Sequence, residues 1–347
     1  MALLAIFDND VEITARNGSL VLLRKGVAFQ TIPPHEVEEV HLHGGAELTT
    51  AGRNFLLARG IDVVFLTLDG RTRGRLVGEE SAWAARRLAQ YRLITDDSRR
   101  IVLARAFVRG KLLNQHSLLR ARQRYLRRDE IAEALLMLKG LAIAVHDAAS
   151  LDALRGVEGM GAQLYFGSFA SVITNGAFAW TGRNRRPPRD PVNAALSFGY
   201  TMLCNRMEHA VRRAGLDPYL GVLHESIRGA PALALDLAEE FRPVVDGLVL
   251  NLVNRGQLGP EDFEPPSPEA MEAAFPEGVP ESLAGAVYLS DVGRKILTRA
   301  WALRLADRSP HPTLGADWSL AGLISEQALQ LKRVFEGEAA EYHPAKV

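Results

Sequence analysis

The sequence predicts an α+β fold, with a small β-rich N-terminal domain over residues 1–80 and a larger all-α domain over residues 81–347. Three observations support this prediction. Up to about residue 78 the sequence changes character every six to nine residues, and turn signals are frequent. Beyond residue 80 those signals thin out and apolar residues recur at spacings of three and four. A chain of 347 residues also exceeds the size at which one core stops growing, so two domains are expected.

The N-terminal part consists of short apolar or alternating runs that end at Asn-Gly, Lys-Gly, Pro-Pro and Asp-Gly pairs. We interpret these runs as strands and hairpins, and the first of them begins in MALLAIF. One piece, TTAGRNFLLARG at residues 49–60, has helical spacing instead. Thr49 or Thr50 is its expected N-cap and Gly60 its expected end.

The remainder is expected to be helical, as in WAARRLAQYRLI, RIVLARAFVRGKLLNQHSLLRA and EIAEALLMLKGLAIAVHDAASL. Asp190 before Pro191 predicts the start of a further helix, and Gly215 predicts its end. Residues 262–283 are rich in proline and glutamate and are expected to form an irregular loop.

Composition excludes several classes of protein. One cysteine, Cys204, rules out an internal disulfide framework and a cysteine-based zinc site, which favours a reducing compartment. No eighteen uncharged apolar residues run together, so no membrane span is expected. We therefore expect a cytoplasmic protein without a membrane partner.

The formal net charge is zero, but charge is segregated along the chain. Residues 71–128 contain 16 Lys and Arg against 4 Asp and Glu, whereas residues 235–285 contain 11 acidic residues against 2 basic ones. A basic field near an acidic patch suits a phosphodiester enzyme, because cations hold the nucleic-acid backbone and carboxylates hold a divalent metal. The alternative is a pair of solvated helix faces.

Residues 221–241, GVLHESIRGAPALALDLAEEF, place four titratable side chains beside an apolar helix that starts near Pro231. Asp236, Glu239 and Glu240 fall at i, i+3 and i+4, where like charges repel. A divalent cation would remove that repulsion, and His224 is positioned to supply a ligand from the preceding segment.

Glu158 stands among Gly156, Gly159 and Gly161. Each interior glycine costs a helix about 0.8–1.0 kcal/mol relative to alanine, so we expect a close approach of a backbone or ligand here. Downstream apolar residues predict that this helix is buried on the face formed by Tyr165, Phe166, Phe169 and Ile173.

Glu158, His224 and Glu239 together form a two-carboxylate, one-imidazole set that suits Mg²⁺ or Mn²⁺ and phosphoryl transfer. The alternative for each residue alone is a structural histidine or a surface carboxylate. Zinc proteolysis is disfavoured because HESIR lacks the second histidine of H-E-x-x-H.

An arginine-rich loop precedes the helix that starts at Pro191. Guanidinium groups match phosphate oxygens well, so this loop is a candidate DNA contact. The alternative is a solvated basic loop. The arginines are Arg183, Arg185, Arg186 and Arg189.

The order of five segments resembles one family, the CRISPR-associated spacer-acquisition endonuclease and integrase Cas1. These segments are VEG followed by YF, RRPPRDPVNAALSFGYTML, GLDPYLGVLHE, LALDLAEEFRPVVDGLVL and VYLSDVGRKIL. The likeness spans nearly the whole chain, and the acidic, proline-rich segment 262–283 departs from it.

The resemblance implies that Glu158, His224 and Glu239 are metal ligands, that Asp236 is an assisting acid, and that residues 81–347 form the catalytic domain. It implies a metal-dependent DNA endonuclease and integrase that inserts protospacer DNA into a CRISPR array by attack of a 3′-hydroxyl on a phosphodiester. The implied partners are double-stranded DNA with free 3′ ends, CRISPR repeat DNA, a second copy of the chain bound through the β-rich domain, and Cas2 bridging two such dimers. Two rivals stay open: a metal-dependent nuclease unconnected with CRISPR, and a non-catalytic nucleic-acid-binding scaffold.

Overall fold

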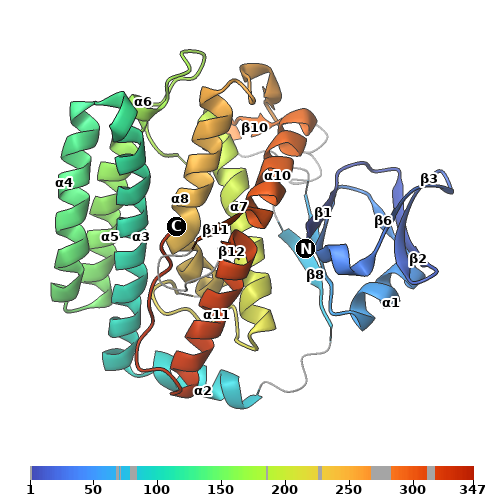
Figure 1. Cartoon of the computed structure of the whole chain (residues 1–347), viewed down its shortest axis with the longest axis horizontal. Helices are drawn as coiled ribbons and strands as arrows, with labels where there is room; N and C mark the ends of the chain where they lie inside the picture. The colour runs from blue at the N-terminus through green and yellow to red at the C-terminus, as the bar shows by residue number, and fades with distance from the viewer. Residues whose placement is uncertain are drawn as a thin grey trace.

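Two four-stranded sheets form the N-terminal part of the chain (Figure 1). The computed structural model describes residues 2–67, 70, 72–78, 84–184, 187–225, 229–266, 283–310 and 317–347. The first sheet has the order β1-β5-β7-β8, with β1, β5 and β7 parallel and β8 antiparallel to β7. The second has the order β4-β3-β2-β6. The strands are β1 (Ala2–Ile6), β2 (Val11–Arg16), β3 (Ser19–Arg24), β4 (Val27–Ile32), β5 (Val37–His43), β6 (Glu47–Leu48), β7 (Asp62–Leu66) and β8 (Thr72–Leu76).

Local sequence explains the tight turns of the second sheet. Asn17 and Gly18 join β2 to β3 with φ angles of 48° and 76°, and Lys25 and Gly26 join β3 to β4 with 50° and 77°. Two positive φ angles are what a two-residue hairpin turn requires. Helix α1 (Thr50–Ala58) begins where Thr49 accepts a hydrogen bond from the backbone N–H of Gly52, and Gly60 follows its end with a φ of 62°. The predicted strands and this helix are therefore confirmed.

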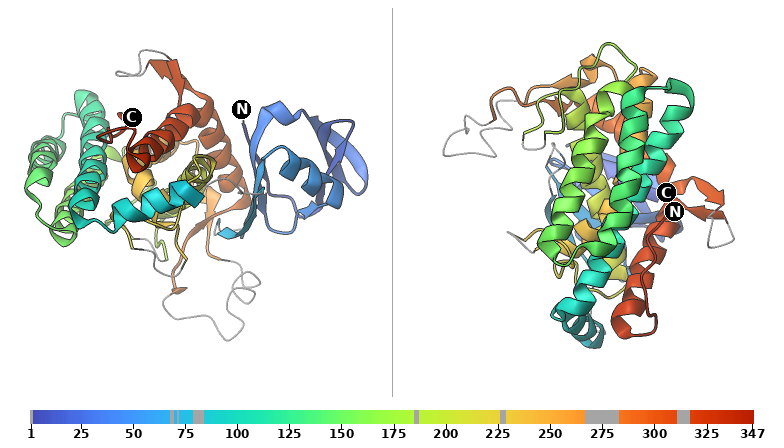
Figure 2. Two further views of the ribbon diagram at one scale, coloured as in Figure 1. Left: turned by 90° about the horizontal axis from the view of Figure 1, so that it is seen from below. Right: turned by 90° about the vertical axis from the view of Figure 1, so that its left-hand side faces the viewer.

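The helical part begins with α2 (Ala84–Ile94) and continues as two packed groups of helices. One group contains α3 (Asp97–Leu126), α4 (Asp129–Ala144) and α5 (Leu151–Gly167), and the short α6 (Phe169–Val172) follows α5. The other contains α7 (Pro191–Arg213), α8 (Ala232–Asn254), α10 (Asp291–Ala306) and α11 (Leu320–Glu336). Figure 2 shows α3 to α5 at one end of the molecule and the N-terminal strands at the other. The central helices α7 and α8 are therefore covered on most sides.

The helix boundaries follow capping signals. Asp190 accepts the N–H of Asn193 at 2.8 Å and Pro191 opens α7, as predicted, and Gly215 follows with a φ of 80°. Helix α8 begins directly after Pro231, also as predicted. Helical spacing does not predict two short ladders in this part: β9 (Phe263–Glu264) pairs with β10 (Tyr288–Leu289), and β11 (Arg308–Pro310) pairs with β12 (Asp317–Ser319). Most of the predicted 262–283 loop lies outside the described residues.

Two separate hydrophobic clusters form the interior. One lies among the N-terminal strands and α1, and the other extends from Leu93 to Ala345 through the helices. Between them, β5, β7 and β8 contact α7 through buried charged side chains, which we call the interface network: Glu38, Glu39, Asp62, Arg75, Arg206, Glu208 and His209. The boundary between two domains near residue 80 stays a prediction. None of the described helices is both long and apolar enough to cross a membrane.

Candidate metal-binding active site

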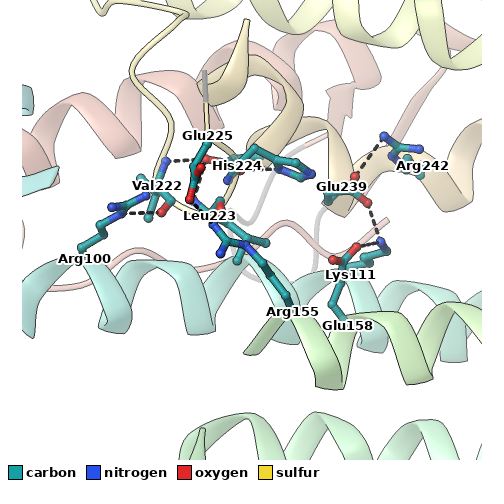
Figure 3. Close-up of polar contacts among 11 residues, drawn as sticks. Arg100, Lys111, Arg155, Glu158, Val222, Leu223, His224, Glu225, Glu239 and Arg242 are labelled. Carbon is teal, nitrogen blue, oxygen red and sulfur yellow. Dashed lines mark hydrogen bonds and ion pairs between the residues drawn. The ribbon is translucent and has the colours of Figure 1, made fainter. Parts of the chain in front are cut away.

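Three helices and one loop bring together the acids that the sequence singles out (Figure 3). Glu158 lies on α5, Glu239 on α8, and His224 in the loop that joins α7 to α8. Lys111 of α3 lies between the two glutamates: its ammonium contacts Oε1 of Glu158 and lies 2.6 Å from Oε2 of Glu239. Two carboxylates from different helices therefore converge on one point.

The loop before α8 is fixed by hydrogen bonds to its backbone. Arg100 donates to the carbonyl of Val222 at 2.7 Å, and Arg155 donates to the carbonyl of Leu223 at 2.9 Å. Gly221 permits the tight path, because a Cβ there would lie 2.4 Å from the carbonyl oxygen of His224. These contacts fix the backbone from which the His224 side chain extends.

Asp236 completes the hold on His224. It is fully buried, and its carboxylate accepts the backbone N–H groups of Val222, Leu223 and His224 at 2.5, 3.0 and 2.9 Å. The same carboxylate lies 2.7 Å from Nδ1 of His224. Because an ionised carboxylate only accepts, we assign the proton to Nδ1, which leaves the lone pair of the neutral ring on Nε2. In Figure 3 the ring extends toward Glu239.

Charge neighbours set the titration of the site. Burial alone raises the pKa of Glu239, but Arg242 and Lys111 outweigh it and hold that pKa at about 2. Burial lowers the pKa of His224, but the hydrogen bond to Asp236 and the charges of Asp236, Glu239 and Glu158 outweigh it, so this pKa lies above its ordinary value. Glu239 is therefore ionised at neutral pH, and the charges of Glu158 and Glu239 both raise the pKa of His224.

The three acids of α8 do not share one partner, contrary to what their spacing suggests. Asp236 holds the loop, whereas Glu240 accepts the backbone N–H of Ala345 at 2.8 Å in the C-terminal segment. Burial raises the pKa of Glu240 to about 8, so at pH 7 it is mostly neutral and unsuited to binding a cation. Only Glu239 of the three faces Lys111.

The three glycines around Glu158 differ in their surroundings. At Gly161 a Cβ would lie 2.2 Å from a methyl group of Leu112, so a neighbouring side chain packs closely there. At Gly156 and Gly159 nothing lies within 4 Å of an added Cβ. Both positions lie on the exposed face of α5, so no described part of the chain approaches them, and the expected approach of a ligand stays a prediction.

Two basic residues of the site were not predicted. Lys111 is 4% exposed on the inner face of α3, in a helix whose pattern makes that face apolar. A lysine one turn after the apolar Phe107 and Val108 was the available signal. Arg242 lies one turn after Glu239 and contacts its Oε1 at 2.9 Å. Pro243 beside it has no N–H to donate to the Glu239 carbonyl, so α8 lacks one backbone bond at this point.

By residue type, the donors of the site suit a hard divalent cation. Oxygens of two carboxylates face one cationic group, and an imidazole with Nδ1 engaged lies nearby. Oε2 of Glu239 is buried, and its polar contact among the described residues is the Lys111 ammonium. Within the described ranges, however, no three His, Cys, Asp or Glu side chains are close enough to hold a metal together. The Lys111 ammonium takes the place between the two carboxylates instead.

The predicted arginine contacts are only partly described. Arg183 donates to Oδ1 of Asn193 at 2.6 Å and lines a cavity of about 1330 Å³ beside α8, together with Arg73, Arg75, Arg212, Arg242 and Arg294. Arg189 is exposed. Arg185 and Arg186 lie outside the described residues. DNA binding by these four arginines stays a prediction.

Fold and site together define an α+β protein with a charged carboxylate–imidazole cluster where three helices meet. Two solved structures share this fold over 99% of the chain, each with a TM-score of 0.81. One is a Cas6-RT-Cas1–Cas2 complex, 24% identical over 36% of that chain, and the other a casposase bound to integration product, 20% identical over 93% of that chain.

Sequence comparison identifies the family. The family model for CRISPR associated protein Cas1 matches residues 4–302. A relative from Thermus thermophilus, named CRISPR-associated endonuclease Cas1 1, is 39% identical over 93% of this chain and 92% of its own length. The chain belongs to the Cas1 family, and the resemblance drawn from its sequence is confirmed.

Proposed function

We propose that this protein is a metal-dependent DNA endonuclease and integrase that inserts protospacer DNA into a CRISPR array. The observation that carries the proposal is the convergence of Glu158 and Glu239 on one buried cation, beside a histidine anchored by Asp236. Glu158, Glu239 and Nε2 of His224 would hold Mg²⁺ or Mn²⁺. The bound ion would neutralise charge that develops on the attacked phosphate and help to form an oxygen nucleophile.

The reaction exchanges one phosphodiester for another. The 3′-hydroxyl oxygen of the protospacer bonds to phosphorus, the bond to a repeat-strand 3′-oxygen breaks, and the proton passes to that oxygen, so no ATP is required. In cleavage, water replaces the protospacer hydroxyl. Asp236 keeps the His224 ring in one orientation, and Arg242 keeps the carboxylate of Glu239 ionised and in place.

The groove beside α8 supports a polyanionic substrate. Arginines predominate among its charged lining residues, and it reaches Arg242, the direct neighbour of Glu239. Guanidinium groups bind phosphate oxygens in pairs, so a DNA strand in this groove would end near the site. Arg183 and Arg189 are the described candidates from the arginine-rich loop.

The proposed assembly is a dimer of this chain through the β-rich part, with Cas2 bridging two dimers. One structural neighbour is part of a Cas6-RT-Cas1–Cas2 complex, which supports Cas2 as partner. The casposase neighbour is bound to integration product, which supports DNA as the partner. Double-stranded DNA with free 3′ ends and CRISPR repeat DNA are the substrates of the proposed reaction.

A single charge-neutral substitution tests the proposal. Glu158→Gln should lower Mn²⁺-dependent cleavage by about 1,000-fold or more, because the metal supplies several kcal/mol of charge stabilisation. The matched control is Glu225→Gln: Glu225 adjoins His224 in sequence, but its side chain is 65% exposed and pairs only with Arg155 among the described residues. The control should stay within about 2-fold of wild type, since a surface pair contributes little.

Cleavage of linear DNA and strand transfer into a repeat-bearing plasmid with Cas2 are both measured, with DNA binding and circular dichroism as checks on the fold. Full cleavage by Glu158→Gln would refute the metal-ligand assignment. Cleavage without strand transfer in the wild type would instead leave a nuclease and remove the integrase.

A further inference from the structure

Lys111 holds an unusual position for a lysine. Its side chain is 6% exposed and reaches from α3 to carboxylates on two other helices. The neighbouring positions Leu112, Asn114 and Gln115 are also buried, so the stem is packed along its length. Buried ammonium groups are rare and require paired acids. Here the paired acids are the two carboxylates proposed to hold the metal (Figure 3).

We propose that Lys111 is a built-in counter-cation that holds Glu158 and Glu239 in the metal-free protein and must withdraw before a divalent metal binds. Lys111 is thus a positioning residue that sets metal affinity. This inference rests on the proposed function, because it takes the two glutamates as metal ligands.

Geometry makes the two cations mutually exclusive. The ammonium lies 2.6 Å from Oε2 of Glu239 and also contacts Oε1 of Glu158. An Mg²⁺ or Mn²⁺ ion binds carboxylate oxygens at about 2.1 Å, so an ion shared by the same two oxygens would overlap the ammonium nitrogen. One cation must leave for the other to enter.

Charge balance gives the same result. Lys111 and Arg242 carry two positive charges that balance the two negative charges of Glu158 and Glu239. A divalent ion added to this group would leave an excess of two positive charges in a poorly solvated place. Withdrawal of the ammonium reduces that excess to one, and interactions between buried charges are weakly screened.

Lys111 is better suited to withdraw than Arg242. The guanidinium of Arg242 contacts the other oxygen of Glu239, Oε1, and lies 4.6 Å from the ring centre of Tyr200. It is therefore compatible with an ion on Oε2. A lysine has a flexible four-carbon stem and a compact charge without fixed donor geometry, so it can change partners with little loss.

Manganese affinity tests the inference directly. Lys111→Met keeps an unbranched apolar side chain, one atom shorter, and removes the charge, so Mn²⁺ should bind at least about 10-fold more tightly than to wild type. The matched control is Arg109→Met, which removes an exposed cation two positions earlier on α3. The Mn²⁺ dissociation constant of Arg109→Met should stay within about 2-fold of that of wild type. Free Mn²⁺ is measured by electron paramagnetic resonance, with no DNA present.

The metal-free protein supplies a second readout. In EDTA, Lys111→Met should melt at a lower temperature than wild type, because two carboxylates then face each other without a counter-charge. Mn²⁺ should raise the melting temperature of this variant by more than it raises that of wild type. An unchanged or weaker Mn²⁺ affinity in folded Lys111→Met overturns the inference.

A measurement on wild type covers the case in which Lys111→Met does not fold. Acetylation of lysines by an amine-reactive ester is followed by mass spectrometry with and without Mn²⁺. The rate at Lys111 should rise several-fold when Mn²⁺ saturates the protein, and an unchanged rate overturns the inference. If wild type binds Mn²⁺ while both readouts stay unchanged, only the role of Lys111 fails. If wild type binds no Mn²⁺, the metal site of the proposed function fails with it.

Discussion

The metal site and the interface network are both clusters of buried charge, but they are built differently. In the network, Arg75 bridges Glu39 and Glu208 at 3.5 and 3.0 Å, and all three side chains are at most 7% exposed. In the site, the side chain of Glu158 is 20% exposed and that of His224 is 34% exposed. Glu158 and Glu239 both contact the flexible side chain of Lys111. The network is held by the planar guanidinium of Arg75, which borders the groove beside α8, whereas the site is more exposed and is held by the ammonium of Lys111.

This difference teaches that buried charge alone does not mark a functional site. Burial raises the pKa of both Glu39 and Glu239, but charged neighbours outweigh it: His41, His209 and Arg75 hold the pKa of Glu39 at about 2, and Arg242 and Lys111 hold that of Glu239 at about 2. What separates the two is access: the His224 side chain near Glu239 is 34% exposed, whereas that of His41, which lies 3.3 Å from Glu39, is 2% exposed. Three predictions sharpen this contrast.

Arg75→Met should have the largest effect, and the effect should be on stability. The substitution leaves Glu39 and Glu208 buried without their shared cation, which costs about 3–5 kcal/mol when a buried pair is broken. Urea denaturation with and without Mn²⁺ measures this loss in the free energy of unfolding. Mn²⁺ should not restore the loss, because the side chains of Glu39 and Glu208 are only 3% and 7% exposed and each has a further cationic partner, His41 or Arg212. Recovery by Mn²⁺, as expected for Lys111→Met, would erase the distinction between the two clusters.

Asp236→Asn should have an intermediate effect, confined to the metal site. The amide still accepts some backbone N–H groups of residues 222–224, but it no longer offers a charged acceptor to Nδ1 of His224. Loss of such a partner weakens metal binding or activity by about 10–100-fold. Mn²⁺ titration and cleavage rates measure this loss. A variant with wild-type Mn²⁺ affinity would show that Asp236 supports only the loop.

Turn chemistry and caps explain why so much of the fold follows from sequence. The Asn-Gly and Lys-Gly pairs adopt the positive φ angles of hairpin turns, and Thr49 and Asp190 are helix caps. These are local effects, decided within three or four residues. The ladders β9–β10 and β11–β12 involve two or three residues per strand, so periodicity could not indicate them.

The site was predictable in its acids but not in its cations. Glu158, His224, Asp236 and Glu239 stood out because polar groups interrupt apolar patterns. Lys111 and Arg242 belong to the site through contacts that only packing creates. Lys111 reaches Glu158 because α3 packs against α5, and it reaches Glu239 because α3 packs against α8. For the same reason the sequence did not reveal the interface network, whose members come from three separate strands and one distant helix.

The smallest predicted effect concerns the pH dependence of stability at His43, beside the interface network. His43 stacks on Phe7 at 4.2 Å and faces Phe198, His41 and Arg294, and burial with the charges of His41 and Arg294 lowers its pKa to about 3. The unfolded chain takes up this proton near pH 6.5, but the folded protein does so only near pH 3, so stability falls as the pH drops through this window. One pH unit below 6.5 this amounts to about 1.4 kcal/mol. His43→Phe keeps the stacking and should lose less stability than wild type between pH 7 and pH 5.5, as measured by urea denaturation at both pH values. Equal losses in the two proteins would show that His43 is protonated in the folded state, and that water reaches this side of the network as it reaches the metal site.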